Sequence, residues 1–454
     1  MKISTATGIL LILSFLPLQA TEPDTVFNSL FRRDIGGWIA ADATYSIPLP
    51  DGRTLWLFGD TFIGSVEENG SAIVPGAKFI RNSAVIQEGE AMSTLTGGTR
   101  TAPSDFIPTE YPDSIWYWPE QGIVDNDTLR IFVSRFATDP TQPAGWNFKQ
   151  IGSCIASYSY PGLEYIGKTP LPVFDLNGVI YGDRLLADSG YIYIYGRRTD
   201  DPSINIAYPH VARTLQGELM KQQWEYFTGS DWSNDPTDTK RMNNFQVSQQ
   251  YSVSEYKGKY ILLTQDIWLS PKIYSFTSFS PTGPWSNKRL LYTTPETEGS
   301  TFTYNAYVHP QFNRDDEMLV SYNVNGDFFS IFSNVEIYRP RFIRVPYMNL
   351  DFWYWPNGTE QKTAGEDLHF SIAPNPVGSE AVVSFHLPAS APVRIRLSDT
   401  AGRVVLNLPV RQADGGENRI VLPMNDLQAG YYFVNIEYQS GSYTLPVIKY
   451  NPGY

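Results

Sequence analysis

The sequence has almost no cysteine and very little histidine. Its 454 residues include one cysteine, Cys154, and four histidines. A single thiol excludes an intrachain disulfide framework and a metal site with several thiolate ligands. The histidines are not spaced as a zinc-binding pair, and no HExxH, P-loop or GxGxxG motif occurs. We therefore predict no metal site and no cofactor.

Basic residues are also scarce. The chain has 34 Lys and Arg residues against 47 Asp and Glu residues, for a net charge of −13. Binding of phosphate backbones requires clustered Lys and Arg, so this composition argues against a nucleic-acid partner. Aromatic residues make up 14% of the chain and hydrophobic residues 42%, which supplies a large core and excludes global disorder.

Long apolar runs are lacking outside the N-terminus. The run ILLILSFL at residues 9–16 follows Lys2 and precedes a small-residue cleavage site at Leu18-Gln19-Ala20. It is too short to span a bilayer in the mature protein. Residues 1–20 are therefore predicted to be a secretory signal peptide, and the mature chain is predicted to be exported.

What the sequence does contain is a repeated hairpin pattern. The first copy has a strand at Ala41–Ile47, a turn at Pro50–Arg53 and an aromatic strand at Thr54–Phe58. Four further copies place their second strands near residues 130, 192, 260 and 318. Spacings of about 60 to 75 residues suit a four-stranded blade with long loops. Five copies predict an all-β fold, a five-bladed β-propeller, with a sandwich-type β fold as the main alternative.

In a propeller the first strand of each blade lines a central channel, so residues that open these strands meet at one mouth. Acids open three of the five first strands, and they are Asp42, Glu120 and Asp183. The alternatives are a turn cap for Asp42, a surface residue after Pro119 for Glu120 and a turn role for Asp183. We further expect residues after Phe27, or around Glu336–Val345, to complete a blade from the opposite terminus.

Polar and aromatic side chains from the loops and other first strands should join these acids. The predicted substrate-binding residues are Arg81, Asn82, Trp118, Arg184, Gln249, Asn305 and His309. Aromatic faces beside acids suit sugars, whose C–H faces stack on rings while their hydroxyls take hydrogen bonds. The alternative for Trp118 is packing between blades, and Asp60 is expected to be a turn or salt-bridge residue that could orient Arg81.

Three carboxylates in one mouth cannot all ionise freely, because repulsion and burial raise at least one pKa. We expect Glu120 to be the general acid, since residues 116–119 can shield it from water. Asp42 would then be the ionised partner, acting as a base toward water or as a nucleophile. Asp183 would tune the acid and orient the substrate.

The opening stretch from Asp42 to Phe62 resembles the first motif of the bacterial propellers catalogued as domains of unknown function 4185 and 5005. The segments Tyr307–Pro310 and Val320–Asn323 are similar to their last-blade signature, and the resemblance covers residues 27 to 350. It implies the activity of a glycoside hydrolase, because part of this group is classed as family 183, with endo-D-arabinanase activity. More distantly the chain resembles the five-bladed glycosidases of families 43 and 117, which place three acids around the channel. Asp42 matches their first-blade acid by position.

The end of the chain resembles a type IX secretion sorting domain of type A, through Ile372–Pro376, Ile395–Val404, Leu427–Val434 and Lys449. Its alternating strands separately predict a small β-sandwich, Ig-like, at residues 369–454. A polar linker at 353–368 separates it from the propeller at 25–352. The resemblance implies Bacteroidota-type export through the outer membrane, to the medium or the cell surface.

Two function classes follow. The first is a secreted or cell-surface glycoside hydrolase that acts on an extracellular polysaccharide, with an arabinan-like furanoside polymer as the candidate substrate. The second is a non-catalytic carbohydrate-binding propeller. Hydrolysis needs two carboxyls about 5 to 9.5 Å apart, and a lectin does not. We expect a monomer whose partners are a polysaccharide and the type IX secretion machinery. A calcium ion in the channel is not predicted and is left open.

Overall fold

The structure is a computed structural model that describes residues 20–68, 70–112, 114–142, 147–201, 206–267, 269–350, 370–387, 389–399, 403–438 and 441–450. Residues 1–19 of the predicted signal peptide and the predicted linker at 353–368 lie outside the described residues. The chain is mostly β and divides into two compact units, residues 1–352 and 353–454. No helix within the described ranges is long and apolar enough to cross a membrane.

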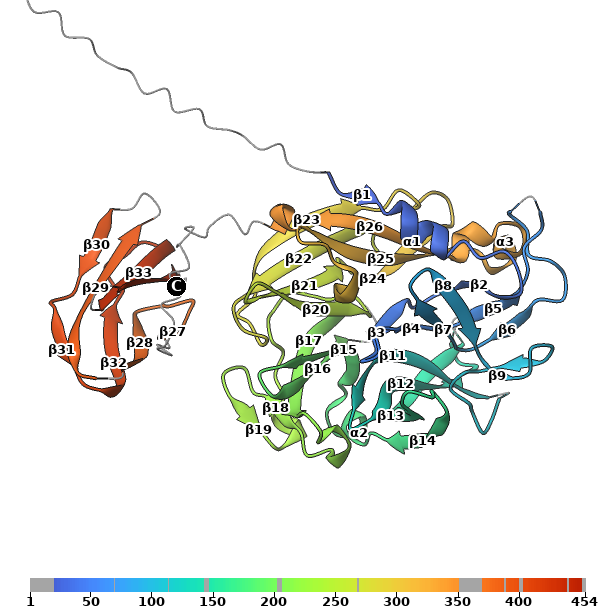
Figure 1. Cartoon of the computed structure of the whole chain (residues 1–454), viewed down its shortest axis with the longest axis horizontal. Coiled ribbons are helices and arrows are strands. Elements are labelled where there is room, and N and C mark those ends of the chain that lie inside the picture. The colour runs from blue at the N-terminus through green and yellow to red at the C-terminus, as the bar shows by residue number, and fades with distance from the viewer. Residues whose placement is uncertain are drawn as a thin grey trace, which may run out of the picture. The chain divides into compact units, whose positions relative to one another are not determined.

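Five antiparallel sheets in the described part of the first unit each open on one of the predicted hairpins (Figure 1). Each sheet has four or five strands. In spatial order, the strands are β3 (Tyr45–Pro48), β4 (Thr54–Phe58), β7 (Ser83–Glu88) and β8 (Ala91–Leu95); β11 (Ile115–Asp125), β12 (Thr128–Thr138), β13 (Phe148–Ser159) and β14 (Tyr165–Pro170); β15 (Ile180–Asp188), β16 (Tyr191–Asp201), β17 (Ile206–Leu215), β18 (Glu225–Phe227) and β19 (Trp232–Ser233); β20 (Tyr251–Tyr256), β21 (Lys259–Gln265), β22 (Lys272–Ser278) and β23 (Ser286–Thr293); and β24 (Phe302–Val308), β25 (Glu317–Asn325), β26 (Pro340–Pro346) and β1 (Glu22–Pro23).

The first strands of these sheets lie side by side in a closed ring. Strand β3 contacts β11, β11 contacts β15, β15 contacts β20, and β20 contacts β24. The ring closes between β24 and β3, where the Tyr45 and Tyr307 ring centroids are 5.0 Å apart. At the same junction the Ser46 hydroxyl and Nδ1 of His309 are 2.7 Å apart. Inward side chains from different sheets therefore meet near the axis of the ring.

The second strands carry much of the core. All five residues of β4 and all seven of β21 are buried, as are the first eight of the nine in β25. Each of these strands lies between two strands of its own sheet and faces the neighbouring sheets. A strand buried on both faces reads as a continuous apolar run rather than an alternating one, which is why these hairpins stand out in the sequence.

The N-terminus completes the last sheet, because β1 pairs antiparallel with β26. Asp24, directly after β1, caps helix α1 (Thr25–Leu30) by accepting the Phe27 N–H at 2.7 Å. Its other carboxylate oxygen accepts from Nε of Arg344 at 2.6 Å. The strand that completes the sheet therefore lies before Phe27, whereas the sequence predicted residues after Phe27. Its partner, β26 (Pro340–Pro346), overlaps the other predicted region, Glu336–Val345.

The first hairpin is broken in its first strand. Instead of one strand over Ala41–Ile47, the chain forms β2 (Gly37–Ala41) and β3, with Ala43 at a left-handed φ of +62° between them. Strand β2 pairs with β5 (Thr61–Gly64) in a separate three-stranded sheet. A non-glycine residue with positive φ is uncommon, and an alanine in the sequence gives no indication that its backbone will be left-handed. The prediction of a continuous strand was wrong for that reason.

Short elements complete the first unit. They are β6 (Lys78–Ile80) beside β5, the pair β9 (Gly97–Gly98) and β10 (Pro103–Ser104), the helices α2 (Val173–Asn177) and α3 (Phe328–Ser333), and 3₁₀ turns at Leu219–Lys221, Pro236–Asp238, Pro310–Phe312, Val335–Tyr338 and Tyr347–Leu350. Helix α3 packs on the β2–β5 sheet, because Ile331 and Val335 share a buried cluster with Ile39 and Phe62.

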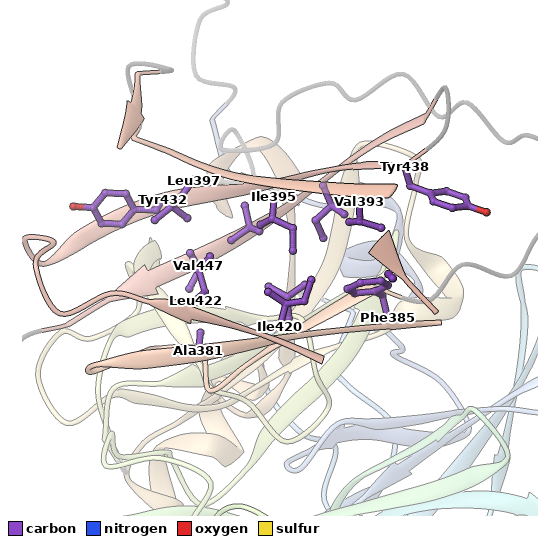
Figure 2. Close-up of a cluster of buried hydrophobic side chains, with 14 of the residues drawn as sticks. Ala381, Phe385, Val393, Ile395, Leu397, Ile420, Leu422, Tyr432, Tyr438 and Val447 are labelled. Atoms are coloured by element: carbon purple, nitrogen blue, oxygen red, sulfur yellow. The ribbon is translucent and has the colours of Figure 1, made fainter. Parts of the chain in front are cut away.

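Two sheets build the second unit. One has the order β27 (Phe370–Ala373), β28 (Glu380–Leu387) and β32 (Gly416–Pro423); the other has the order β30 (Val404–Asn407), β29 (Ala391–Asp399), β33 (Gly430–Tyr438) and β34 (Gly441–Lys449), with β31 (Arg411–Ala413) also on β29. Side chains from both sheets form one buried cluster, in which Phe385 and Leu422 meet Ile395 and Leu397 (Figure 2). Burial alternates along β29 and β33, as expected for strands with one face on a core.

Candidate active site

Asp42 and Asp60 face each other at the break in the first hairpin. Asp42 follows β2 and Asp60 precedes β5. The Asp42 N–H donates to the Asp60 carbonyl at 3.3 Å, and the Gly59 N–H donates to the Asp42 carbonyl at 3.1 Å. Position 59 needs glycine because a Cβ there would lie 2.5 Å from Oδ1 of Asp42. Two residues of one strand thus oppose one residue of the other, an arrangement that redirects side chains and is common beside active sites.

Neutral hydrogen-bond donors hold the Asp42 carboxyl. The Tyr304 hydroxyl donates to Oδ2 of Asp42 at 3.0 Å, and Nδ2 of Asn325 donates to the Tyr304 oxygen at 3.1 Å. Burial, together with the negative charge of Asp60, raises the pKa of Asp42 to about 7, although bonds from Tyr304 and Tyr338 oppose the shift. Asp42 therefore exchanges a proton near neutral pH.

Asp60 has a cationic partner, whereas Asp42 has none among the described residues. Nη1 of Arg81 donates to Oδ2 of Asp60 at 3.1 Å, and Nε1 of Trp118 donates to Oδ1 at 2.9 Å. Burial raises the pKa of Asp60 as well, but Arg81 and Trp118 counteract that rise. The two carboxyls are neighbours in different electrostatic environments, which is how one site holds both a protonated and an ionised acid.

Trp118 and Arg81 connect this pair to the solvent. The Trp118 ring packs against Phe136 and Phe148, with centroid distances of 4.4 and 5.1 Å. The Arg81 guanidinium lies 4.4 Å from the Trp116 ring centroid. The Arg81 side chain is 39% exposed and that of Asp60 16%. Arg81 and, to a smaller extent, Asp60 are therefore accessible to solvent. We call Asp42, Asp60, Arg81, Trp118 and Tyr304 the outer group.

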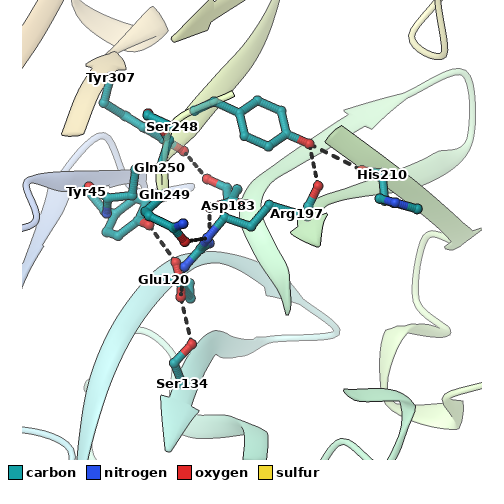
Figure 3. A network of polar contacts seen from close by, with 12 residues as sticks. Tyr45, Glu120, Ser134, Asp183, Arg197, His210, Ser248, Gln249, Gln250 and Tyr307 are labelled. Atoms are coloured by element: carbon teal, nitrogen blue, oxygen red, sulfur yellow. Dashed lines mark hydrogen bonds and ion pairs between the residues drawn. The ribbon is translucent and has the colours of Figure 1, made fainter. Parts of the chain in front are cut away.

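A second group of charges is more deeply buried (Figure 3). Nη2 of Arg197, on β16, donates to Oε1 of Glu120 at 3.3 Å, and its Nη1 pairs with Oδ1 of Asp183. Glu120 also accepts from the Tyr45 hydroxyl at 2.6 Å and from the Ser134 hydroxyl at 2.7 Å. Each of the three charged residues is less than 10% exposed. We call Tyr45, Glu120, Ser134, Asp183 and Arg197 the inner group.

Irregular pairing in the first strands directs these acids inward. The register against the second strand shifts between residues 119 and 122 in β11, between 181 and 184 in β15, and between 304 and 307 in β24. Glu120 and Asp183 lie within the first two of these shifts. The same local device at corresponding places in different sheets therefore brings their carboxyls to one guanidinium.

Burial dominates the electrostatics of the inner group. It raises the pKa of Asp183 well above its usual range, with Glu120 adding to the rise and Arg197 opposing it. Burial and the charges of Glu120 and Asp183 likewise raise the pKa of Tyr45. The Tyr307 hydroxyl donates to the Asp183 carbonyl at 3.0 Å, while Oδ2 of Asp183 has no hydrogen-bond partner among the described residues. The inner group is held mainly by protein contacts.

The structure thus divides the residues expected at one mouth between two groups. Asp42, Arg81 and Trp118 are in the outer group, and Glu120 and Asp183 are in the inner group. Arg184 and Gln249 lie beside the inner group: the Arg184 guanidinium is 6.0 Å from the Tyr307 ring centroid, and Gln249 accepts from Nε of Arg197 at 3.1 Å. Asn305 is partly exposed at a left-handed φ of +57°, and its amide forms no hydrogen bond within the described part of the chain.

Two residues predicted to bind substrate are buried, and their side chains form hydrogen bonds within the protein instead. Asn82 is 0% exposed; its amide donates to the Ile107 and Tyr117 carbonyls at 3.2 and 2.9 Å, and its oxygen accepts the Ile107 N–H at 2.6 Å. His309 is also 0% exposed, and both ring nitrogens meet serine hydroxyls, at 2.7 and 2.8 Å. Burial lowers the pKa of His309 well below its usual value. Neither side chain is accessible to a ligand here.

Several members of these groups were not predicted from the sequence. Arg197 had a signal, since a cation follows the otherwise apolar run of the third repeat's second strand. Asp60 was expected to be a turn or salt-bridge residue that could orient Arg81, and it does form a salt bridge with that residue. Tyr45 and Tyr304 had no signal beyond their residue type, because only the closed ring brings them to the acids. Among the described residues, no group of three or more His, Cys, Asp or Glu side chains could hold a metal ion.

Several solved structures resemble this chain. A protein of Bacteroides ovatus, described as a candidate hydrolase, is 24% identical with a TM-score of 0.61, and the match covers 74% of this chain and 91% of that one. A family 43 glycoside hydrolase from Xanthomonas citri, complexed with xylose, is 14% identical with a TM-score of 0.37 over 71% and 93% of the chains. An arabinoxylan arabinofuranohydrolase of family 43 from Bacillus subtilis, complexed with cellotetraose, is 14% identical with a TM-score of 0.37 over 91% and 95%. No curated protein matches the chain.

Two family models match the chain and together span most of it. The secretion system C-terminal sorting domain matches residues 371–450, so the protein is exported through the outer membrane and is secreted or held at the cell surface. The domain of unknown function 5005 matches residues 24–364, which include both the outer and the inner group. The chain therefore belongs to the family of the domain of unknown function 5005, followed by a secretion sorting domain.

Proposed function

We propose that this protein is an exported glycoside hydrolase in which Asp42 and Asp60 perform the bond cleavage. One observation carries the proposal: two neighbouring carboxyls with different partners lie beside a half-exposed arginine and a tryptophan. The pKa of Asp42 is raised to about 7, whereas Asp60 has Arg81 as a counter-ion. Pairs of carboxyls with such differing environments supply the acid and the base of glycoside hydrolysis.

In this mechanism Asp42 is the proton donor. Its proton passes to the glycosidic oxygen as the bond between that oxygen and the anomeric carbon breaks. Asp60, kept ionised by Arg81, attacks the anomeric carbon and forms a glycosyl ester. Water then adds to the same carbon, gives its proton to Asp42 and releases Asp60. Arg81 is close enough to Asp60 to hold sugar hydroxyls there.

The pairing of the backbones supports this two-step scheme over a single displacement. Directly opposed residues of an antiparallel pair have Cβ atoms about 4.5–5.5 Å apart. Asp42 and Asp60 lie across the strands at a bulge and share one backbone hydrogen bond, so we take this spacing as an approximation for them. Retaining glycosidases place their two carboxyls about 5–5.5 Å apart, whereas inverting ones leave about 6.5–9.5 Å for a water. We therefore propose that the anomeric configuration is retained.

These roles differ from those expected from the sequence, where Glu120 was the proton donor. Glu120 is 4% exposed and takes three donors, one of which is the guanidinium of Arg197. A carboxyl in that setting is a poor candidate for protonating a substrate. We propose that Glu120 and Asp183 are positioning residues, which hold Tyr45 and the first strands around the site.

The proposal extends to architecture. The five sheets are proposed to be the blades of a five-bladed β-propeller at residues 25–352, because their first strands form a closed ring and the N-terminus supplies the last strand. The second unit is proposed to be an Ig-like sandwich at 369–454, after a signal peptide at 1–20 and a linker at 353–368. The proposed partners are the type IX secretion machinery and a polysaccharide, of which arabinan is the first candidate, and the protein is proposed to be a monomer.

The test is a degradation screen of the full mature chain on neutral and acidic polysaccharides, including arabinan, followed by Asp42→Asn and Asp60→Asn. Each variant should lose about 10²- to 10⁴-fold in turnover. Asp51→Asn is the matched control, since Asp51 lies in the exposed turn of the same hairpin and pairs with Arg53. Proton NMR of the first products should show retention. Wild-type turnover in both variants rules out this pair, and a glycan that binds without being cleaved establishes the binding-module alternative.

A further inference from the structure

A cluster of exposed aromatic rings lies beside the outer group. Phe328, Phe329 and Phe332 of α3 are 47%, 79% and 41% exposed, and Phe79 of β6 is 39% exposed. Phe328 lies 5.9 Å from both Phe79 and Phe329, measured between ring centroids. We call these four residues the aromatic ledge. Soluble proteins rarely leave several large apolar side chains together on the surface, and such patches usually bind something.

Ring contacts connect the ledge to the catalytic acids by two routes. On the first, the Arg81 guanidinium lies 5.5 Å from the Phe79 ring centroid and also binds Asp60. On the second, the buried Phe62 ring lies 5.1 Å from Phe79 and 5.9 Å from Tyr338, whose hydroxyl is a hydrogen-bond donor to Asp42. The ledge is therefore continuous with the outer group.

The fold holds the ledge in place rather than leaving it on a loose segment. Ile331 of α3 is 2% exposed, in the cluster that α3 shares with the β2–β5 sheet (Figure 1). The Ile73 N–H donates to the Phe332 carbonyl at 2.9 Å, and the Val335 N–H donates to the Ser71 carbonyl at 2.8 Å. The Asp327 carboxylate caps the helix by accepting the Ser330 N–H. Exposed rings on a fixed backbone bind a ligand at a small cost in conformational entropy.

The charge of the ledge and of the whole chain limits which ligands can bind to the ledge. The six residues of α3, FFSIFS, carry no charge, and Asp327 is already committed to the helix cap. The whole chain has a net charge of −13, which disfavours a polyanion or an anionic membrane at this surface. Flat aromatic faces suit the C–H faces of neutral sugar rings.

We propose that the aromatic ledge is a subsite that stacks the sugar rings of a neutral polysaccharide extending from the Asp42–Asp60 pair. This inference rests on the proposed function and deepens it, because it makes the substrate a polymer rather than a short oligosaccharide. The chain would lie across Phe79 and α3, with its scissile bond at the outer group.

The test compares a long and a short substrate in the mature protein. Phe328→Ala/Phe329→Ala should raise the KM for polymeric arabinan by roughly 10-fold, while kcat/KM on the shortest arabinan oligosaccharide that the wild type cleaves stays unchanged. Phe279→Ala is the matched control, since Phe279 is 57% exposed and directly follows β22, away from the ledge in the sequence. An equal loss on both substrates, or no loss on either, overturns the subsite.

Binding without catalysis separates this inference from the proposed function. In affinity electrophoresis through arabinan and through arabinoxylan, the Asp42→Asn variant should be retarded, and adding the two phenylalanine substitutions should abolish the retardation. If the wild type hydrolyses nothing but this difference persists, the catalytic proposal fails and the subsite stands. If neither gel retards the protein, or both variants are retarded equally, the ledge does not bind a neutral polysaccharide.

Discussion

At Asp42, the proposed proton donor, burial makes the folded state less stable once the proton has left. The pKa of this carboxyl is about 7 in the folded protein and 3.8 for an ordinary aspartate. The folded chain therefore binds the proton more tightly than the unfolded chain. Its contribution to stability is fully present below pH 3.8 and is lost as the pH rises through 7.

Asp42→Asn should remove this loss, because an amide stays neutral at every pH. We expect the variant to be more stable than the wild type at pH 8, by on the order of 1 to 4 kcal/mol, with the difference shrinking toward pH 4. Urea denaturation at pH 4, 6 and 8 measures the effect. A variant that becomes inactive yet more stable at pH 8 marks a residue kept for function. Parallel pH dependences of wild type and variant would contradict the assigned shift.

Arg81 should set the acid limb of the pH–rate profile. In the proposed mechanism kcat/KM falls above pH 7 as Asp42 loses its proton, and it falls at low pH as Asp60 gains one. Arg81→Met removes the charge that opposes the raised pKa of Asp60, so the acid limb should move to higher pH while the alkaline limb moves less. Steady-state rates from pH 4 to 9 give both limbs. Identical acid limbs would show that Asp60 is not the ionised group.

Residue chemistry could be predicted from the sequence only where position in a repeat was enough. Asp42 was singled out because it opens a strand, and it lies in the outer group. Asn82 and His309 were misjudged because a polar residue in a motif looks the same whether it binds sugar or fastens one strand to another. That difference is decided by burial, and burial of both depends on contacts from other sheets.

At the scale of elements, β1 is a two-residue strand with a large structural task. It completes the last sheet, and a buried ion pair between Asp24 and Arg344 fastens it, with side chains 2% and 10% exposed. Asp24→Asn leaves the Arg344 charge buried without its partner, which should lower the free energy of unfolding by about 3–5 kcal/mol. Glu22→Gln on the same strand, where the side chain is exposed, is the control and should change it little. Urea denaturation of both variants decides this, and equal stabilities would mean that β1 is dispensable.

The hairpins were predictable because their second strands are buried on both faces and therefore read as apolar runs. The break between β2 and β3 was not, because it depends on a left-handed Ala43 and on the approach of Gly59 to Asp42. Those features arise from packing between sheets. The aromatic ledge was missed for a similar reason: FFSIFS reads as core in the sequence, and only its place on the small sheet shows which rings face outward.

At the scale of the whole molecule, the two units should separate cleanly in function. A chain ending at residue 352 keeps all strands of the ring and both groups of acids. It should fold, melt at the temperature of the first unit and cleave the same glycan at the same rate, yet remain inside the outer membrane of its native host. Thermal unfolding, activity assays and fractionation of host cells test the three statements. Loss of folding would show that the sorting domain also supports the ring.

Strand β1, which completes the last sheet, is synthesised long before the strand with which it pairs. Asp24 and Arg344 are 320 residues apart, so at 5–20 residues per second roughly 15 to 65 s separate the synthesis of β1 from that of its partner. During that interval no partial chain can complete its last sheet. The sorting domain is made later still, after β26. A truncated product that lacks β26 would therefore also lack the sorting domain, so the order of synthesis keeps such incomplete molecules from being exported.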